Sequence, residues 1–316
     1  MQDGAGMISV VVPVFNEEGN VEKLYAGITS ALQSQGVSYE LVFVDDGSTD
    51  RSVKLLTGLR EKDPQVRIIA LGRNFGRQMA LTAGLDHAHG SAVIMMDADL
   101  QHPPELLPQL IAAHLAGAEI VYTTRHYTTA VGLGKRLSTA LFYKCAAFMG
   151  IALPESGTEF MLLDQKVVRY LRQTRERTRF LRGIIFWLGF KRAAVSFTVP
   201  KRYSGTTKYS LRTMITAALD CIFSFSAAPL YVAGYLGALV SAAGFVYGVY
   251  VLYIKFIKGV AVPGWTSIVL AVLGLGGMQL MSLGIVGAYL GRVYEEIKAR
   301  PLYTIANSWG IADRDA

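Results

Sequence analysis

The sequence predicts an α/β domain with a parallel sheet, followed by a pair of helices long enough to cross a membrane. Over the first part of the chain, short apolar runs alternate with helical patterns, which is typical of βαβ units. Closer to the C-terminus, two long segments carry no charged residue, 221–254 and 259–291. An uncharged apolar stretch of about 18 residues or more is typical of a transmembrane helix.

Composition excludes several classes of protein. The chain of 316 residues is 52% hydrophobic and 17% charged, against about 25% charged residues in average chains. This excludes a disordered chain, and two cysteines, Cys145 and Cys221, are too few for a disulfide scaffold. Residues 164–212 hold 13 basic and two acidic residues, which gives this segment a net charge of 13 − 2 = +11. The net charge of the whole chain is +7, so the rest of the chain is net negative. Nucleic acid, anionic lipid and anionic substrates attract such a block, and the adjoining apolar segment argues against nucleic acid.

Four buried strands are predicted at 8–14, 40–44, 66–71 and 92–96, with helical patterns between them. Each run ends in a polar turn rich in Asn, Asp or Gly. Ligands of parallel α/β sheets bind beyond the carboxyl ends of the strands, so these turns are the expected site. No G-x-G-x-x-G follows the first strand, which argues against a nicotinamide or flavin domain.

Paired carboxylates give the sharpest local signal. Asp97 and Asp99 follow a buried strand, and a divalent cation such as Mg²⁺ or Mn²⁺ would relieve their repulsion, with Gln101 as a neutral oxygen ligand. The Asp45-Asp46 pair ends a neighbouring strand and would accept hydrogen bonds from a base or ribose. The alternative is that Asp97 or Asp99 caps the next helix. His102 has no partner at metal-ligand spacing, so we interpret it as structural.

The two uncharged segments predict membrane spans at 229–254 and 264–290. About 26 residues reach roughly 39 Å, enough to cross a hydrocarbon core of about 30 Å. The short connection predicts a hairpin, and the basic residues on its outer flanks favour a cytoplasmic side for both ends. The alternative is a buried hairpin in a soluble core. Residues 209–228 fit an amphipathic helix at the interface and a core-facing helix equally well. The first residues do not resemble a signal peptide.

Several motifs resemble the family 2 glycosyltransferases of the GT-A fold. They are Pro13-Val14-Phe15-Asn16-Glu17, Val44-Asp45-Asp46-Gly47-Ser48, Asn74-Phe75-Gly76 and Asp97-Ala98-Asp99-Leu100-Gln101. The C-terminal part is similar to polyisoprenyl-phosphate glycosyltransferases, which include bactoprenol glucosyltransferases and relatives of dolichol-phosphate mannose synthase. Its motifs are Arg202-Tyr203-Ser204-Gly205-Thr206-Thr207-Lys208-Tyr209, Phe223-Ser224-Phe225-Ser226 and Tyr289-Leu290-Gly291-Arg292. The resemblance covers about residues 7–303.

The resemblance implies a GT-A (Rossmann-like) nucleotide-sugar domain with interfacial amphipathic helices and a C-terminal two-helix transmembrane hairpin. The implied parts are a cytoplasmic catalytic domain (1–200), an acceptor loop with a juxtamembrane amphipathic helix (201–228), two transmembrane helices (229–291) and a cytoplasmic tail (292–316). It further implies a multi-pass protein of the inner (cytoplasmic) membrane that forms a homo-oligomer, as relatives form tetramers.

The implied activity is the inverting transfer of a hexose, glucose from UDP-glucose, to a polyprenyl phosphate such as undecaprenyl phosphate. One alternative is the same fold acting on GDP-mannose or another nucleotide sugar. Another is a glycolipid or polysaccharide synthase, although such enzymes usually carry Q-x-x-R-W, which this chain lacks. A third is a membrane scaffold with a degenerate nucleotide site, which the intact acidic cluster argues against.

The resemblance also assigns site residues. Those implied to line the nucleotide sugar are Pro13, Val14, Asn16, Glu17, Asp45, Asp46, Asp97, Ala98, Asp99 and Glu159. Asp99 and Gln101 match the metal ligands, and Arg125 and Lys135 match groups that hold the acceptor phosphate. Arg202 and Lys208 match a flexible loop over the diphosphates. The implied catalytic set is Asp97, Asp99, Arg125, Lys135, Arg202 and Lys208.

The chain departs from the family pattern at one place. Relatives often have Gly-Asp-Phe-Arg where this chain has Thr158-Glu159-Phe160-Met161. Glu159 keeps a carboxylate that is one methylene longer, and Met161 loses a cation. We expect the contacts to the sugar and the acceptor to differ here.

Overall fold

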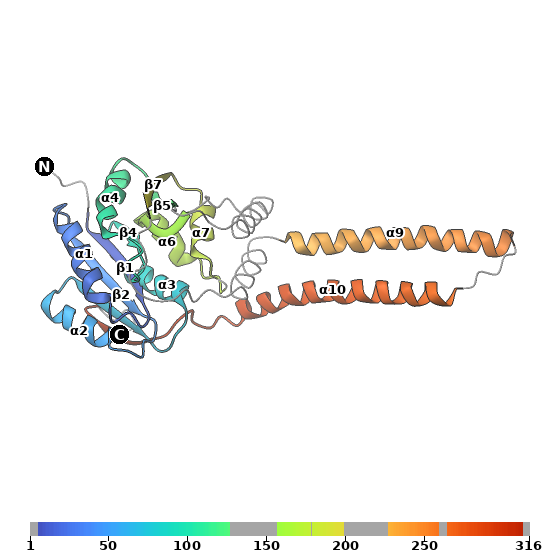
Figure 1. Ribbon diagram of the computed structural model, residues 1–316, viewed down its shortest axis with the longest axis horizontal. Helices are drawn as coiled ribbons and strands as arrows, with labels where there is room; N and C mark the ends of the chain where they lie inside the picture. The colour runs from blue at the N-terminus through green and yellow to red at the C-terminus, as the bar shows by residue number, and fades with distance from the viewer. Residues whose placement is uncertain (1–5, 127–156, 178, 199–226, 259–263, 312–316) are drawn as a thin grey trace. The chain divides into compact units, whose positions relative to one another are not determined.

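The computed structural model describes residues 6–126, 157–177, 179–198, 227–258 and 264–311 (Figure 1). The chain divides into two compact units. One comprises Met1–Ser210 together with Arg300–Ala316, and the other comprises Leu211–Ala299. The first unit contains the sheet and the second contains two long helices.

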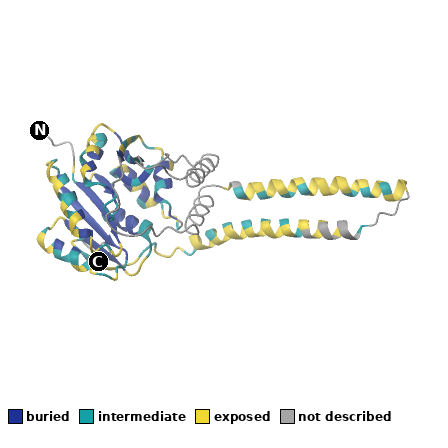
Figure 2. Ribbon diagram, in the orientation of Figure 1, coloured by how far each residue is buried: buried dark blue, intermediate teal, exposed yellow. Residues whose placement is uncertain are grey.

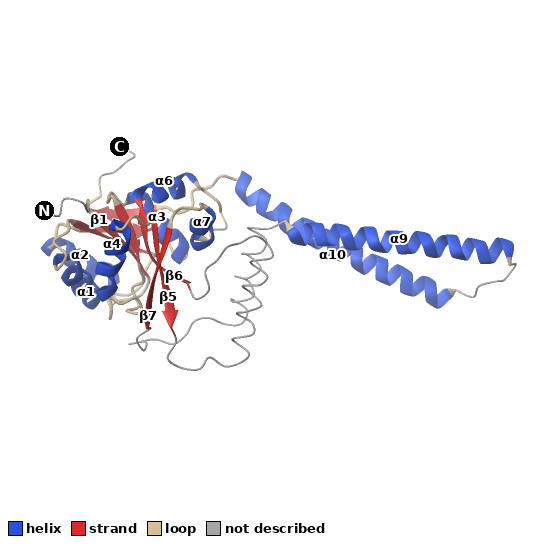
Figure 3. Ribbon diagram, turned by 90° about the horizontal axis from the view of Figure 1, so that it is seen from above, coloured by secondary structure: helices blue, strands red, loops and turns tan. Residues whose placement is uncertain are grey.

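In the described part of the chain, eight strands form one sheet in the order β7-β5-β6-β4-β1-β2-β3-β8. Figure 3 shows the strands of this sheet in red. Their bounds are β1 Ile8–Val14, β2 Tyr39–Asp45, β3 Val66–Leu71, β4 Ala92–Met95, β5 Ile120–His126, β6 Gly157–Asp164, β7 Arg192–Thr198 and β8 Ile305–Trp309. The four predicted strands are confirmed to within one residue at each end. Their sequences are apolar because both faces of the central strands are covered.

The sheet is mixed rather than purely parallel. Strands β1, β2, β3 and β4 pair in parallel, as the alternation of strands and helices predicts. Strand β6, however, runs antiparallel between β4 and β5. This reversal brings the start of β6 next to the end of β4, which Asp97 and Asp99 follow.

Helices cover both faces of the sheet (Figures 1 and 2). On one face lie α1 (Val21–Gln33), α2 (Ser52–Lys62), the short 3-10 helix η1 (Pro104–Leu106) and α4 (Leu107–Leu115). On the other lie α3 (Arg77–His87) and α6 (Gln165–Gln173), with α7 (Leu181–Trp187) beside α6. Gly84 lets α3 pack closely on β1, because a Cβ at this position would lie 2.2 Å from Cγ1 of Val11.

The segment after the second long helix belongs to the first unit. Strand β8 pairs antiparallel with β3, and the amide of Gly72 donates to the carbonyl of Thr304 over 2.9 Å. Burial raises the pKa of Tyr303, whose hydroxyl donates to the Asp86 carboxylate over 2.7 Å. Sequence reasoning assigned 292–316 to a tail and did not identify this strand, which is short and largely exposed.

The second unit consists of α9 (Ala228–Ile257) and α10 (Trp265–Ile297), which contact each other. Among the described residues, one helical segment, Pro229–Ile257, is long and apolar enough to cross a membrane, with a mean hydropathy of 1.7 and none of its most apolar window buried. Such exposure argues against the core of a soluble protein. The other predicted span falls within α10, and residues 201–226 of the predicted acceptor region lie outside the described residues.

We predict that Tyr303→Phe destabilises the sheet-bearing unit by about 1–2 kcal/mol, because Asp86 loses a hydrogen bond in a half-buried site. The urea midpoint of the detergent-solubilised protein should fall. Tyr170→Phe is the control, since Tyr170 is 52% exposed. Equal midpoints for the two variants would contradict a role for Tyr303 in holding the C-terminal segment.

Candidate active site

The predicted site residues gather at the carboxyl edge of β1, β2 and β4. Because these strands are parallel and in register, with Val14 beside Asp45 and Val11 beside Met95, their polar turns meet at one edge. Pro13 and Val14 form the buried end of β1, and Ala98 is buried beyond β4.

The turn after β1 is tied to the turn after β2. Asn16 adopts a φ of 55°, which Asn tolerates better than most residues. Its side-chain oxygen accepts the amide of Thr49 over 2.8 Å, and its own amide donates to the Ser48 hydroxyl over 2.9 Å. The Glu17 amide donates to the Ser52 hydroxyl over 3.0 Å. The backbone of the first motif is therefore fixed by the second.

Asp45 and Asp46 are both buried, and each accepts from backbone amides. Asp46 takes the amides of Phe75 and Gly76 over 2.7 and 3.0 Å, one on each carboxylate oxygen, while burial raises its pKa. The Oδ2 atom of Asp45 takes the amides of Gly47 and Ser48 over 3.2 and 3.1 Å. Its Oδ1 atom has one longer contact of 3.4 Å, so Asp45 keeps more acceptor capacity for a ligand.

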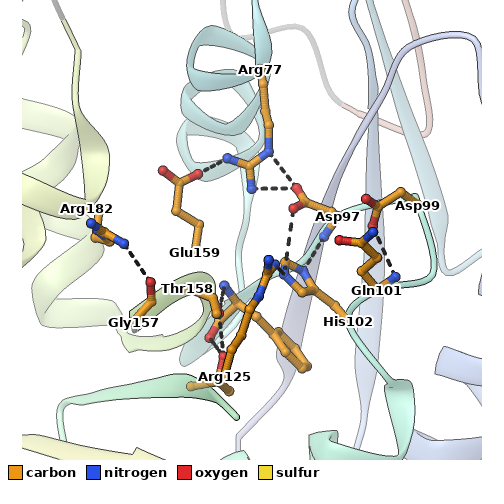
Figure 4. Close-up of polar contacts among 12 residues, drawn as sticks. Arg77, Asp97, Asp99, Gln101, His102, Arg125, Gly157, Thr158, Glu159 and Arg182 are labelled. Carbon is orange, nitrogen blue, oxygen red and sulfur yellow. Dashed lines mark hydrogen bonds and ion pairs between the residues drawn. The ribbon is translucent and has the colours of Figure 1, made fainter. Parts of the chain in front are cut away.

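The Asp97–Gln101 turn places Asp99 and Gln101, the two predicted metal ligands, side by side (Figure 4). Leu100 adopts a φ of 59°, an uncommon conformation for a residue other than Gly, Asn or Asp, and the Gln101 amide donates to Oδ1 of Asp99 over 3.1 Å. Neither carboxylate caps η1 or α4, so the capping alternative is wrong. The donor set fits Mg²⁺ or Mn²⁺, which need few protein ligands when substrate phosphates complete the shell.

His102 supports this turn through a hydrogen bond and by packing. Its ring is fully buried and stacks on Phe160, with centroids 4.9 Å apart. Its Nδ1 atom accepts the Asp97 amide over 2.9 Å, and burial lowers its pKa to about 4. The neutral ring therefore carries its proton on Nε2. The structural interpretation of His102 agrees with this position.

Arg125, at the end of β5, has donors that the described residues do not satisfy. Its Nη2 atom lies 3.1 Å from Nε2 of His102, but both atoms carry hydrogens, so neither can accept. Its Nε atom is buried and has no hydrogen-bond partner among the described residues. Buried guanidinium donors require acceptors, so this position suits an anion.

Sequence reasoning missed Arg77, the first residue of α3. Its Nε and Nη2 atoms lie 2.6 and 2.5 Å from Oδ1 of Asp97, and its Nη1 atom pairs with Glu159 (Figure 4). Burial raises the pKa of Asp97, but the charge and hydrogen bond of Arg77 together with the neighbouring His102 and Arg125 hold this pKa below the usual range. The one available signal was the position of Arg77 directly after the Asn74-Phe75-Gly76 motif.

Of the predicted site residues, three cations fall outside the described residues: Lys135, Arg202 and Lys208. Their placement stays a prediction. In the part of the chain that the structure describes, no cluster of three His, Cys, Asp or Glu side chains suited to a metal occurs. Asp99 and Gln101 therefore remain the candidate metal ligands.

Comparison with known proteins identifies relatives over nearly the whole chain. The family model described as glycosyl transferase family 2 matches residues 9–177. An uncharacterized glycosyltransferase of Synechocystis is 43% identical over 96% of this chain and 96% of that protein. One of Bacillus subtilis is 40% identical, covering 97% and 95% of the two chains. A prophage bactoprenol glucosyl transferase homolog of Escherichia coli is 38% identical, covering 94% and 98%.

We predict opposite effects for alanine at two glycines. Gly47 has a φ of 75°, and a Cβ here would lie 2.7 Å from backbone atoms of Arg73 and Asn74. Gly47→Ala should destabilise the protein by about 1–3 kcal/mol. Gly58→Ala, in α2 with nothing within 4 Å of the added Cβ, should stabilise it by about 0.5–1 kcal/mol. Urea unfolding measures both, and an unchanged midpoint for Gly47→Ala would refute the packing of this turn.

Proposed function

We propose that this chain, which belongs to glycosyl transferase family 2, transfers a sugar from a nucleotide sugar to a polyprenyl phosphate. Glucose from UDP-glucose is the proposed donor, and undecaprenyl phosphate is the proposed acceptor. The observation that carries the proposal is the meeting of carboxylate turns with Arg125 at one sheet edge, where the buried Nε atom of Arg125 has no hydrogen-bond partner among the described residues. The relative named a bactoprenol glucosyl transferase homolog supports the acceptor class.

The donor side of the site is acidic. Asp45 accepts hydrogen bonds from the base or ribose through its Oδ1 atom, which receives one long contact of 3.4 Å from the backbone amide of Ser48. Asp99 and Gln101 would hold Mg²⁺ or Mn²⁺, and Asp97 would lie near the ribose and the diphosphate. When bound, the cation offsets the charge that develops on the departing diphosphate.

The acceptor side is cationic. The lipid phosphate is already an anion near neutral pH, so its oxygen attacks without a strong general base. A bond forms between this oxygen and the anomeric carbon while the bond to the β-phosphate oxygen breaks, which releases the nucleoside diphosphate and inverts the anomeric centre. Arg125 holds the acceptor phosphate with Lys135, and Arg202 and Lys208 close over the diphosphates.

The lipid acceptor explains the two long helices. In this proposal α9 and α10 both span the inner membrane, with the sheet-bearing unit in the cytoplasm and both ends of the hairpin on that side. A polyprenyl phosphate keeps its chain in the bilayer and its phosphate at the surface. We propose a homo-oligomer, with a tetramer as its form.

We predict that Asp99→Ala lowers transfer by about 100-fold or more, because the diphosphate loses its counter-charge. Membranes that contain each variant are supplied with labelled UDP-glucose, undecaprenyl phosphate and Mn²⁺, and labelled lipid is extracted. Glu61→Ala removes an exposed carboxylate of α2 and serves as the control. Unchanged transfer by Asp99→Ala would overturn the metal assignment.

The same assay tests donor and acceptor. A panel of nucleotide sugars, including GDP-mannose, identifies the sugar that the wild-type protein transfers best. Transfer to water or to soluble glycans, with none to undecaprenyl phosphate, would exclude the proposed acceptor.

We predict that Arg125→Met raises KM for undecaprenyl phosphate by about 10- to 100-fold, since a charge-assisted contact to phosphate is lost. The KM for the nucleotide sugar should change by less than about threefold. Arg169→Met, which removes an exposed cation of α6, is the control. A rise confined to KM of the nucleotide sugar would place Arg125 on the donor instead.

A further inference from the structure

Asp97 lies just beyond the end of β4, and Glu159 lies near the start of the neighbouring strand β6. The antiparallel register of β4 and β6 pairs Ile94 with Leu162 and Met95 with Met161. Asp97 follows two residues after Met95, beyond the end of β4, and Glu159 precedes Met161 by two residues within β6, so both carboxylates lie where these two strands meet. Two carboxylates in one place repel each other, and a cation between them relieves this repulsion.

Arg77 is that cation. It pairs with Asp97 through Nε and Nη2 and with Glu159 through Nη1. A cation in the first turn of a helix is disfavoured by the helix dipole, so the position of Arg77 in α3 depends on the carboxylates it meets. The side chains of Arg77, Asp97 and Glu159 are 37%, 23% and 15% exposed, so they are partly desolvated and still border the site.

Glu159 is fixed from two further directions. The side-chain amide of Gln78 donates to Oε1 of Glu159 over 2.9 Å. The side-chain oxygen of Gln78 accepts the backbone amide of Leu181 over 3.3 Å. The Thr158 hydroxyl lies 2.5 Å from that of Thr123 on β5, which holds the start of β6. The Oε2 atom of Glu159 is buried, whereas its Oε1 atom accepts one hydrogen bond from Gln78 and keeps acceptor capacity for a ligand hydroxyl.

We propose that Arg77 is a positioning residue of the donor site that clamps Asp97 and Glu159 in one relative orientation, so that Glu159 accepts hydrogen bonds from hydroxyls of the donor sugar. This inference rests on the proposed function. The planar guanidinium is suited to bridge two carboxylates, whereas an ammonium group is a point charge and cannot hold both in a fixed geometry.

The test is a double-mutant cycle on binding of UDP-glucose to the full-length protein in detergent with Mn²⁺, measured by calorimetry. Arg77→Met should weaken binding by about 100-fold, because it leaves two facing carboxylates. Arg77→Lys should weaken it by about 10-fold. Arg77→Met combined with Glu159→Gln should bind at least about 10-fold more tightly than the product of the single losses predicts, because the repulsion is gone.

Sugar selection supplies a readout that a purely structural role would not move. UDP-glucose and UDP-galactose differ at one hydroxyl, and the ratio of their affinities should approach 1 in Arg77→Lys. Arg169→Met is the matched control for loss of a cation, and urea unfolding verifies that each variant is folded. If Arg77→Met does not fold, Arg77→Lys with and without Glu159→Gln completes the cycle.

Additive losses in the cycle, or an unchanged ratio in Arg77→Lys, would overturn the clamp. Failure of the proposed function looks different, because the wild-type protein would then bind UDP-glucose without transferring glucose to undecaprenyl phosphate. A wild-type protein that binds no UDP-hexose would overturn both the donor assignment and the clamp.

Discussion

The constraint on which this site depends is the crowding of carboxylates at one sheet edge. Asp45, Asp46, Asp97, Asp99 and Glu159 all follow or border strands that end there. Two kinds of partner stabilise them. Backbone amides hold the two carboxylates after β2, and the Arg77 guanidinium holds Asp97 and Glu159. Part of this charge is thus offset in the protein itself before a ligand or a cation adds to it.

The two antiparallel strands explain how distant parts of the chain reach this edge. Strand β6 brings Glu159 to the end of β4, and β8 brings Thr304 to the amide of Gly72. Gly72 begins the loop whose amides at Phe75 and Gly76 hold Asp46. The segment that follows α10 therefore stabilises the same loop that shapes the candidate nucleotide site.

Sequence reasoning recovered what is local in the chain. The strands at 8–14 and 66–71 were predictable because apolar runs stop at polar turns. The closeness of Asp97, Asp99 and Gln101 was predictable because they are neighbours in the chain, and the metal-ligand role of Asp99 and Gln101 stays a prediction. The Arg77–Asp97–Glu159 network was not, because it depends on the register of β4 and β6. Strand β8 carries no apolar run, so its pairing with β3 left no periodic signal.

Carboxylates held by backbone amides and carboxylates held by side chains differ in how they respond to substitutions nearby. The turns after β2 and β3 depend on backbone geometry, with φ of 75° at Gly47 and 94° at Gly76, so few substitutions are tolerated there. Glu159 is held by side chains alone, those of Arg77 and Gln78. A substitution at any of these three positions changes the contacts of the Glu159 carboxylate and removes none of the backbone amides that hold Asp45 and Asp46. The same short segment, Thr158-Glu159-Phe160-Met161, is where the chain departs from the pattern of its relatives. Variation in donor preference is therefore expected at Glu159 and its two partners, while the nucleotide turns stay fixed.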